Sequence, residues 1–119
     1  MRKILIISFA LISFSSIILI ASKTFNISES QLNSISSKYG SSGKNRVEAW
    51  DSMIESSKNE SLLNKIKNVN DFFNQITYKT DAAHWKQKDY WATPFEFMGT
   101  GAGDCEDYAI AKYFSLVKL

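Results

Sequence analysis

Hydrophobic positions recur at helical spacing in three stretches of the chain. Between Ser61 and Ile76 they recur every three or four residues, which predicts an amphipathic helix with its apolar stripe in the core. A second helix is expected from Asn45, which would serve as its N-cap, and a third from about Asp104 onward. The apolar stripes are Val47, Trp50, Met53 and Ile54; Leu62, Ile66, Val69, Phe73 and Ile76, widened by Leu63 and Phe72; and Ala109, Tyr113 and Leu116, with Ile110, Phe114 and Val117 close by.

The segments between these helices have different patterns. Residues 22–44 are rich in Ser, Asn and Gly, which predicts a mostly extended lead-in with a turn at 39–43. Residues 77–103 contain aromatic side chains without a helical period, and Pro94 acts as a breaker, so we expect a long packed loop there. Three glycines at the end of this stretch allow tight or left-handed turns just before the last helix: Gly99, Gly101 and Gly103.

A short basic head and an apolar run open the chain. Arg2 and Lys3 precede a run of 18 apolar residues and serines, 4–21, which is the pattern of an export signal. The run is just long enough to span a bilayer, and the cleavage sites near Ala21 and Ser22 lack a small residue at the −3 position. The sequence therefore fits both a signal peptide that is cleaved and an inner-membrane anchor that is not. Either outcome places residues 23–119 outside the cytoplasm.

We accordingly divide the chain into a signal peptide or membrane anchor (1–21), a lead-in (22–44) and one domain (45–119).

Composition then excludes several classes of protein. Fourteen Lys and Arg face twelve Asp and Glu, and two of the basic residues belong to the head, so the remainder is neutral and nucleic-acid binding is not expected. One Cys excludes an intramolecular disulfide and a CxxC zinc site, and one His excludes a His-rich metal centre.

The candidate chemistry lies at the start of the last predicted helix, in the sequence Asp104-Cys105-Glu106-Asp107. Unpaired backbone N–H groups and the helix dipole stabilise a negative sulfur at such a position. The three carboxylates repel a thiolate, so either a protonated histidine or a bound cation must offset them, and carboxylate oxygens suit calcium (Ca²⁺). From spacing alone, a small buried cysteine and acids that merely cap the helix remain alternatives.

The stretches VNDFFNQITYKTD and HWKQKDYWATPFEFMGTGAGDCEDYAIAKYFSL resemble the bacterial transglutaminase-like cysteine proteinases, the LapG-type periplasmic proteases. The resemblance covers about Tyr39 to Leu119 and is most specific from Asp89 to Leu116. It implies an α+β, papain-like or transglutaminase-like fold, present here mostly as the helical N-terminal lobe without the C-terminal β-sheet.

The resemblance also implies roles for the residues of the acidic segment. Cys105 matches the nucleophile of the family's Cys-His-Asp triad. Asp104 and Glu106 match positions that bind the calcium on which activity depends, and Asp107 is an adjacent further candidate. The implied substrate is a large surface adhesin, which is cut in the periplasm so that cells leave a biofilm. The implied partner is an inner-membrane receptor that senses cyclic di-GMP and sequesters the protease.

One departure from the family pattern concerns the rest of the triad. The family's His and Asp lie downstream of the Cys, but only three residues follow Leu116 here. The single histidine, His84, lies upstream and is interpreted as a partly packed loop residue. We therefore expect this chain to be a truncated N-terminal part of the enzyme that is inactive as written. The alternatives are a non-enzymatic exported module that binds calcium or a partner, and an acyl-transfer relative.

Overall fold

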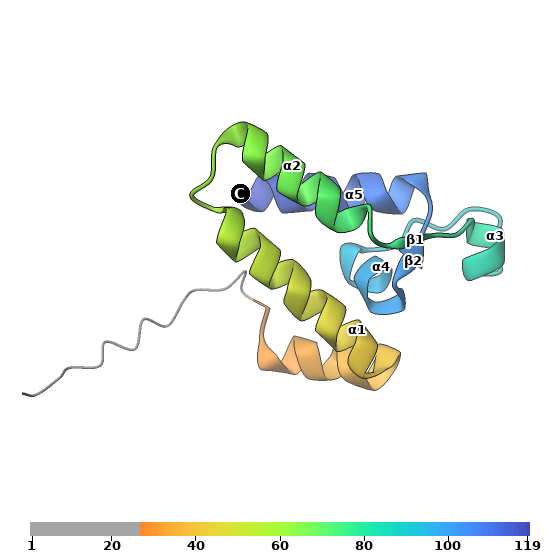
Figure 1. Cartoon of the computed structure of the whole chain (residues 1–119). Helices are drawn as coiled ribbons and strands as arrows, with labels where there is room; N and C mark the ends of the chain where they lie inside the picture. The colour runs from red at the N-terminus through yellow and green to blue at the C-terminus, as the bar shows by residue number, and fades with distance from the viewer. Residues whose placement is uncertain (1–26) are drawn as a thin grey trace, which may run out of the picture.

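The computed structural model describes residues 27–119, which form helices and two short strands (Figure 1). The elements, in chain order, are α1 (Glu29–Ser57), α2 (Leu62–Phe73), β1 (Thr77–Tyr78), α3 (Asp81–His84), α4 (Pro94–Thr100), β2 (Ala102–Gly103) and α5 (Cys105–Lys118). Within 27–119, no helix has the length and apolar character needed to cross a membrane. The predicted signal peptide or anchor, 1–21, lies outside the described residues.

Helix α1 occupies most of the segment that composition predicts to be extended. The Ser28 hydroxyl accepts the backbone N–H of Gln31 at 3.2 Å, and the Gln31 side chain accepts the Ser28 N–H at 2.8 Å. This capping box begins the helix at Glu29. The expectation of extended backbone is therefore wrong for 29–44. Serine-rich composition marks helix caps as well as loops, and the burial of two apolar side chains, Leu32 and Ile35, holds this part of α1 against the core.

Helix α1 changes direction at Gly40, where φ is 75° and ψ is −178°. Glycine adopts this left-handed region without the steric cost that a Cβ would bring. Figure 1 shows the first part of α1 folded back along the longer second part. The predicted turn at 39–43 is thus confirmed, but the helix resumes directly after it, so Asn45 lies within α1 and is not its N-cap.

The core lies where α1, α2, α4 and α5 meet. The Trp50 ring contacts the Phe73 ring edge-on at 6.3 Å, and Phe73 stacks on Phe97 at 6.0 Å. The predicted core stripe of α2 is only half confirmed. Val69 and Phe73 are buried, whereas the first turns expose Leu62, Leu63 and Ile66.

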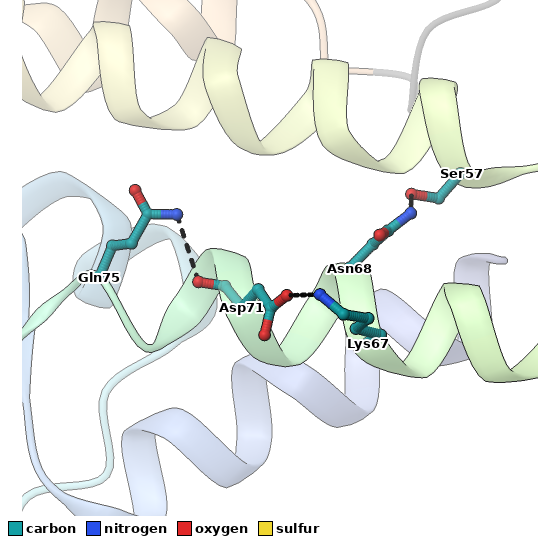
Figure 2. Close-up of polar contacts among 5 residues, drawn as sticks. All are labelled: Ser57, Lys67, Asn68, Asp71 and Gln75. Carbon is teal, nitrogen blue, oxygen red and sulfur yellow. Dashed lines mark hydrogen bonds and ion pairs between the residues drawn. The ribbon is translucent and has the colours of Figure 1, made fainter.

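Polar side chains on α2 and just after it connect this helix to α1 and to its own last turn (Figure 2). The Asn68 amide donates to the hydroxyl of the fully buried Ser57 at 3.0 Å, which links α2 to the end of α1. Lys67 and Asp71 form an ion pair one turn apart, and the Gln75 amide donates to the backbone carbonyl of Asp71 at 3.2 Å. Such exposed ion pairs contribute little stability, so the part-buried hydrogen bond to α1 matters more.

Four short elements divide the segment expected to be a long loop over 77–103, and residues 85–93 remain without helix or strand. The Thr93 hydroxyl accepts the backbone N–H of Glu96 at 3.2 Å and so caps α4. Pro94 occupies the first position of α4, where its missing N–H costs nothing and its fixed φ favours the helix. The proline therefore begins a helix here and does not break one. Helices as short as α3 and α4 complete too few turns to show a hydrophobic period.

Strands β1 and β2 pair in parallel, with Tyr78 opposite Gly103. The backbone N–H of Lys79 continues the ladder by donating to the Gly103 carbonyl at 2.8 Å. Gly101 follows α4 in a left-handed conformation, φ 71°, which turns the chain directly into β2. Of the three glycines predicted to turn the chain here, Gly101 is the one with a positive φ. The pairing places the end of β1 beside the start of α5.

Helix α5 begins where the sequence predicts, but it buries a different face. Its buried residues are Asp107, Ala111 and Ser115, one turn apart. The Ser115 hydroxyl accepts the indole N–H of Trp50 at 2.8 Å. The small residues on this face of α5 leave room for the large Trp50 ring of α1. The predicted apolar stripe is mostly exposed within the part of the chain that the structure describes, at Tyr113, Phe114, Leu116 and Val117.

Candidate active site

Cys105 is the first residue of α5, and its side chain is exposed. The residue before it, Asp104, is the N-cap and has extended backbone, with φ −111° and ψ −166°. In this position Cys105 lies at the positive end of the helix dipole, beside first-turn N–H groups that have no partner within the helix. A thiol placed in this way is available to an approaching substrate. The alternative of a small buried core cysteine does not fit this exposure.

Three aspartates converge next to Cys105. One carboxylate oxygen from each of Asp81, Asp104 and Asp107 lies within 4.8 Å of the others. Asp81 is the first residue of α3, whereas Asp104 and Asp107 belong to the start of α5. Asp81 and Asp107 are 6% and 1% exposed. We call these three residues the aspartate cluster.

Hydrogen bonds hold the cluster but leave two of its oxygens without a protein donor. Asp81 Oδ2 accepts the backbone N–H of Tyr90 at 2.7 Å. Asp107 accepts the N–H of Ala92 at 2.9 Å through Oδ1 and the N–H of Asp104 at 3.2 Å through Oδ2. The remaining oxygens Asp81 Oδ1 and Asp104 Oδ1 are buried without a hydrogen-bond partner. Buried carboxylate oxygens are costly unless a donor or a cation satisfies them.

The electrostatics of the cluster favour a cation. Burial raises the pKa of the Asp104 carboxyl, and the hydrogen bond and negative charge of Glu106 raise it further. Burial likewise raises the pKa of Asp107. Both effects disfavour the ionised carboxylates, and a positive ion would offset them. Carboxylate oxygens are the donors that calcium prefers, and the three aspartates would supply part of the roughly 6–8 oxygens it takes.

Comparison with known proteins identifies the family. Residues 38–119 match the family model described as bacterial transglutaminase-like cysteine proteinase BTLCP. The chain belongs to this family. The matched range agrees with the predicted resemblance from about Tyr39 to Leu119. A search of curated proteins finds no match.

Solved structures of the same family are similar to the chain. Calcium-bound LapG from Legionella pneumophila is 40% identical, with a TM-score of 0.62, over 77% of this chain and 51% of that chain. EGTA-treated LapG from Legionella pneumophila is 39% identical, with the same TM-score, over 77% of this chain and 50% of that chain. The chain thus spans about half the length of these solved structures. The predicted transglutaminase-like α+β fold, represented here by its mostly helical part, is confirmed.

The structure brings together two of the three acidic residues that the sequence predicts as calcium ligands. Asp104 and Asp107 lie together in the aspartate cluster, while Glu106 is exposed and outside it. Glu106 still influences Asp104, so its part in a metal site stays a prediction. The sequence analysis missed Asp81. Its position after a capping threonine signals the start of a helix, but nothing in the local sequence indicates that this helix adjoins α5.

The side-chain hydrogen bond and the ring contact of His84 are with Thr100 and Trp85 and not with the proteinase nucleophile Cys105. Its Nε2 is 3.0 Å from the Thr100 hydroxyl, and its ring contacts Trp85 edge-on with 4.6 Å between centroids. These contacts attach the end of α3 to the end of α4. The interpretation of His84 as a partly packed residue is confirmed, although it lies in a short helix and not in a loop.

Proposed function

We propose that this chain carries the nucleophile and the calcium site of a calcium-dependent cysteine endopeptidase. The observation that carries the proposal is the exposed Cys105 at the start of α5, directly beside the aspartate cluster. Membership of a cysteine proteinase family supports the chemistry. The calcium-bound and EGTA-treated forms of LapG support calcium as the ion.

The chemistry starts at the Cys105 sulfur, which in its thiolate form attacks the carbonyl carbon of a peptide bond. The helix dipole would stabilise the charge on the sulfur, and a first-turn backbone N–H would stabilise charge on the carbonyl oxygen. A base must take the thiol proton and return it to the leaving amine. His84, the one histidine of the sequence, has its Nε2 at 3.0 Å from the Thr100 hydroxyl, and we propose that another group acts as this base.

Calcium would be held by Asp81 and Asp104 through their unpaired oxygens, and by Asp107, with Glu106 as a further candidate. When bound, the ion would offset the negative charge that these carboxylates place beside the sulfur. The hydrogen bonds from Tyr90 and Ala92 orient two of the carboxylates before any ion arrives. Such outer contacts fix the direction of metal ligands.

The biological setting is also a proposal. We propose a large surface adhesin as the substrate, with release from a biofilm as the outcome, and an inner-membrane receptor that senses cyclic di-GMP as the inhibitor. The family resemblance supports both. We propose the periplasm as the location, supported by the basic head and apolar run of residues 1–21.

The first experiment tests whether calcium changes the reactivity of the Cys105 thiol in residues 1–119. Iodoacetamide should label Cys105 in the native chain, faster with calcium than with EGTA, because the ion removes repulsion from the thiolate. Cys105→Ser should abolish labelling, and Asp104→Asn should remove the difference between calcium and EGTA. A thiol that reacts at the same rate in both buffers would contradict coupling between the ion and the nucleophile.

A second experiment tests hydrolysis. Residues 1–119 alone should cut no adhesin fragment at any calcium level. A chimera that joins them to the remaining half of Legionella LapG should cut the fragment in calcium, and Cys105→Ala should end that activity. Calcium binding by a chimera that folds but cuts nothing, with or without Cys105, would instead favour a non-enzymatic calcium-binding module.

A further inference from the structure

The segment before α4 runs along the aspartate cluster. The backbone N–H of Tyr90 donates to Asp81 at 2.7 Å. Two residues later, the backbone N–H of Ala92 donates to Asp107 at 2.9 Å. In extended backbone, N–H groups two residues apart point the same way, and the side chain between them faces away from its two neighbours. Two hydrogen bonds to the cluster therefore hold the backbone on either side of Trp91.

Trp91 presents its ring to solvent. It is 66% exposed, whereas Ala92 beside it is 2% exposed. The indole N–H of Trp91 donates to Asp89 Oδ1 at 3.2 Å, which orients the ring on the surface. The other two tryptophans pack within the fold, Trp50 in the core and Trp85 against neighbouring aromatic rings. Trp91 is thus the tryptophan whose apolar surface is open to a ligand.

Trp91 and Cys105 are exposed on two chain segments that meet at Asp107. Trp91 is one residue from Ala92, which is bonded to Asp107, and Cys105 lies two residues before Asp107 in α5. Each residue of an extended peptide spans about 3.3 Å. A peptide whose carbonyl carbon reaches the Cys105 sulfur therefore needs only a few further residues to reach the Trp91 ring.

The start of α5 offers a peptide charge but little apolar surface. Asp104 and Glu106 flank Cys105 in the sequence, and carboxylates provide hydrogen-bond acceptors only. The first exposed large apolar residue of α5 is Tyr113, eight residues beyond Cys105, which is about 12 Å along the helix axis. Trp91 therefore supplies an aromatic surface that the start of α5 lacks.

We propose that Trp91 is a specificity-determining residue, whose indole ring packs against a bulky apolar side chain of the peptide that Cys105 attacks. The proposal rests on the proposed function of Cys105 as a nucleophile. Packing against the exposed ring removes apolar surface of both partners from water, and the gain grows with the size of the peptide side chain. Aromatic side chains gain further from ring-to-ring contact. The site should therefore prefer peptides with a large apolar residue near the bond that is cut.

Alkylation by peptide reagents tests this recognition without hydrolysis. In each reaction the Cys105 sulfur bonds to a methylene carbon, the halide leaves, and the thiol proton goes to the buffer. Iodoacetyl-tripeptide amides carry the peptide on one side of that carbon, and tripeptidyl chloromethyl ketones carry it on the other. Phenylalanine replaces each glycine of triglycine in turn. Mass spectrometry follows the rates in the full chain with calcium, with iodoacetamide as the reagent without a peptide.

In at least one position, phenylalanine should raise the labelling rate of the unmodified chain about three- to tenfold over triglycine, as expected for one aromatic contact. Trp91→Ala should remove this preference and leave the iodoacetamide rate unchanged. Trp91→Phe should keep part of the preference. Tyr113→Ala is the matched control, because it removes a similarly exposed aromatic ring later in α5 and should keep the preference in full.

The proposal is overturned if the unmodified chain prefers phenylalanine in no position, or if Trp91→Ala keeps the preference. It is also overturned if Trp91→Ala slows iodoacetamide as much as the peptide reagents, because the ring then supports the thiol and not the peptide. Failure of the proposed function has a separate signature, namely that the chimera with Trp91 intact cuts no adhesin fragment. The labelling preference needs no hydrolysis, so it decides the role of Trp91 separately.

Discussion

The Asp107 carboxylate accepts the backbone N–H of Ala92 at 2.9 Å, and both residues are almost fully buried. This bond joins the first turn of α5 to the segment that leads into α4. The other oxygen of Asp107 accepts the N–H of Asp104. A single side chain therefore holds both the start of the nucleophile helix and the segment around Ala92. Asp107 therefore supports the site whether or not it binds an ion.

Replacing Asp107 should lower the free energy of unfolding. Asp107→Ala leaves the buried Ala92 N–H without its acceptor, and we expect a loss of about 1–3 kcal/mol. Asp107→Asn keeps one acceptor oxygen and should lose less. Urea unfolding in EGTA measures both, with Asp71→Ala as the control because this carboxylate is on the exposed side of α2. An unchanged midpoint for Asp107→Ala would contradict the structural role.

Without calcium, the cluster should make the folded chain less stable as the pH rises. Burial raises the pKa values of Asp104 and Asp107, so above the ordinary aspartate value of about 3.9 the folded chain binds more protons than the unfolded chain. Their contribution is complete below that pH and is lost as the pH rises through the folded-state values. Urea midpoints in EGTA at a series of pH values test the sign.

The variant Asp104→Asn isolates this contribution to the pH dependence. It removes one titrating group and relieves repulsion within the cluster, so the decline in stability should become shallower. Identical pH profiles for the variant and the unmodified chain would show that Asp104 titrates normally. Asp71→Asn, far along α2, should leave the profile unchanged.

Calcium affinity should distinguish Asp81 from Glu106. Asp81 is buried with an unpaired oxygen in the cluster, whereas Glu106 is exposed and outside it. Because ligand charge sets calcium affinity, Asp81→Asn should weaken binding by about tenfold or more, and Glu106→Gln should have a smaller effect. Titration calorimetry with calcium chloride provides the measurement. The reverse order would place the ion on the outer side of α5 and away from the cluster.

The exposed apolar side chains of α2 and α5 should cause self-association. Leu63 is 78% and Val117 63% exposed, and Lys65 on α2 donates to the carbonyl of Leu119 at 2.9 Å, which brings these two regions together. Apolar patches beyond about 600 Å² seldom persist on soluble monomers. We expect aggregation or oligomers by light scattering at on the order of 10 micromolar.

One added charge tests this surface. Leu63→Lys should shift the chain toward monomer, while Asn64→Lys adds the same charge at a neighbouring exposed polar position and should not. A chain that is already monomeric at that concentration, with a cooperative thermal transition, would contradict the prediction.

The amino-acid sequence by itself determined the features that depend on neighbouring residues. The start of α5 follows from the glycine-rich turn and from Asp104 as an N-cap, because capping acts within one helical turn. The direction change at Gly40 lies within the turn that its glycines predict. The family resemblance likewise rests on a contiguous stretch that includes Cys105.

Tertiary structure alone decided the features that depend on distant contacts. Asp81 joins Asp104 and Asp107 because the pairing of β1 with β2 brings α3 to the start of α5, and no local pattern records that pairing. The sequence pattern likewise did not predict which face of α5 is buried. The ring of Trp50 needs small neighbours, so Ala111 and Ser115 face the core, while larger apolar residues of the same helix remain on the surface. Hydrophobic spacing identifies a helix, but the shape and polarity of its neighbours decide which side is buried.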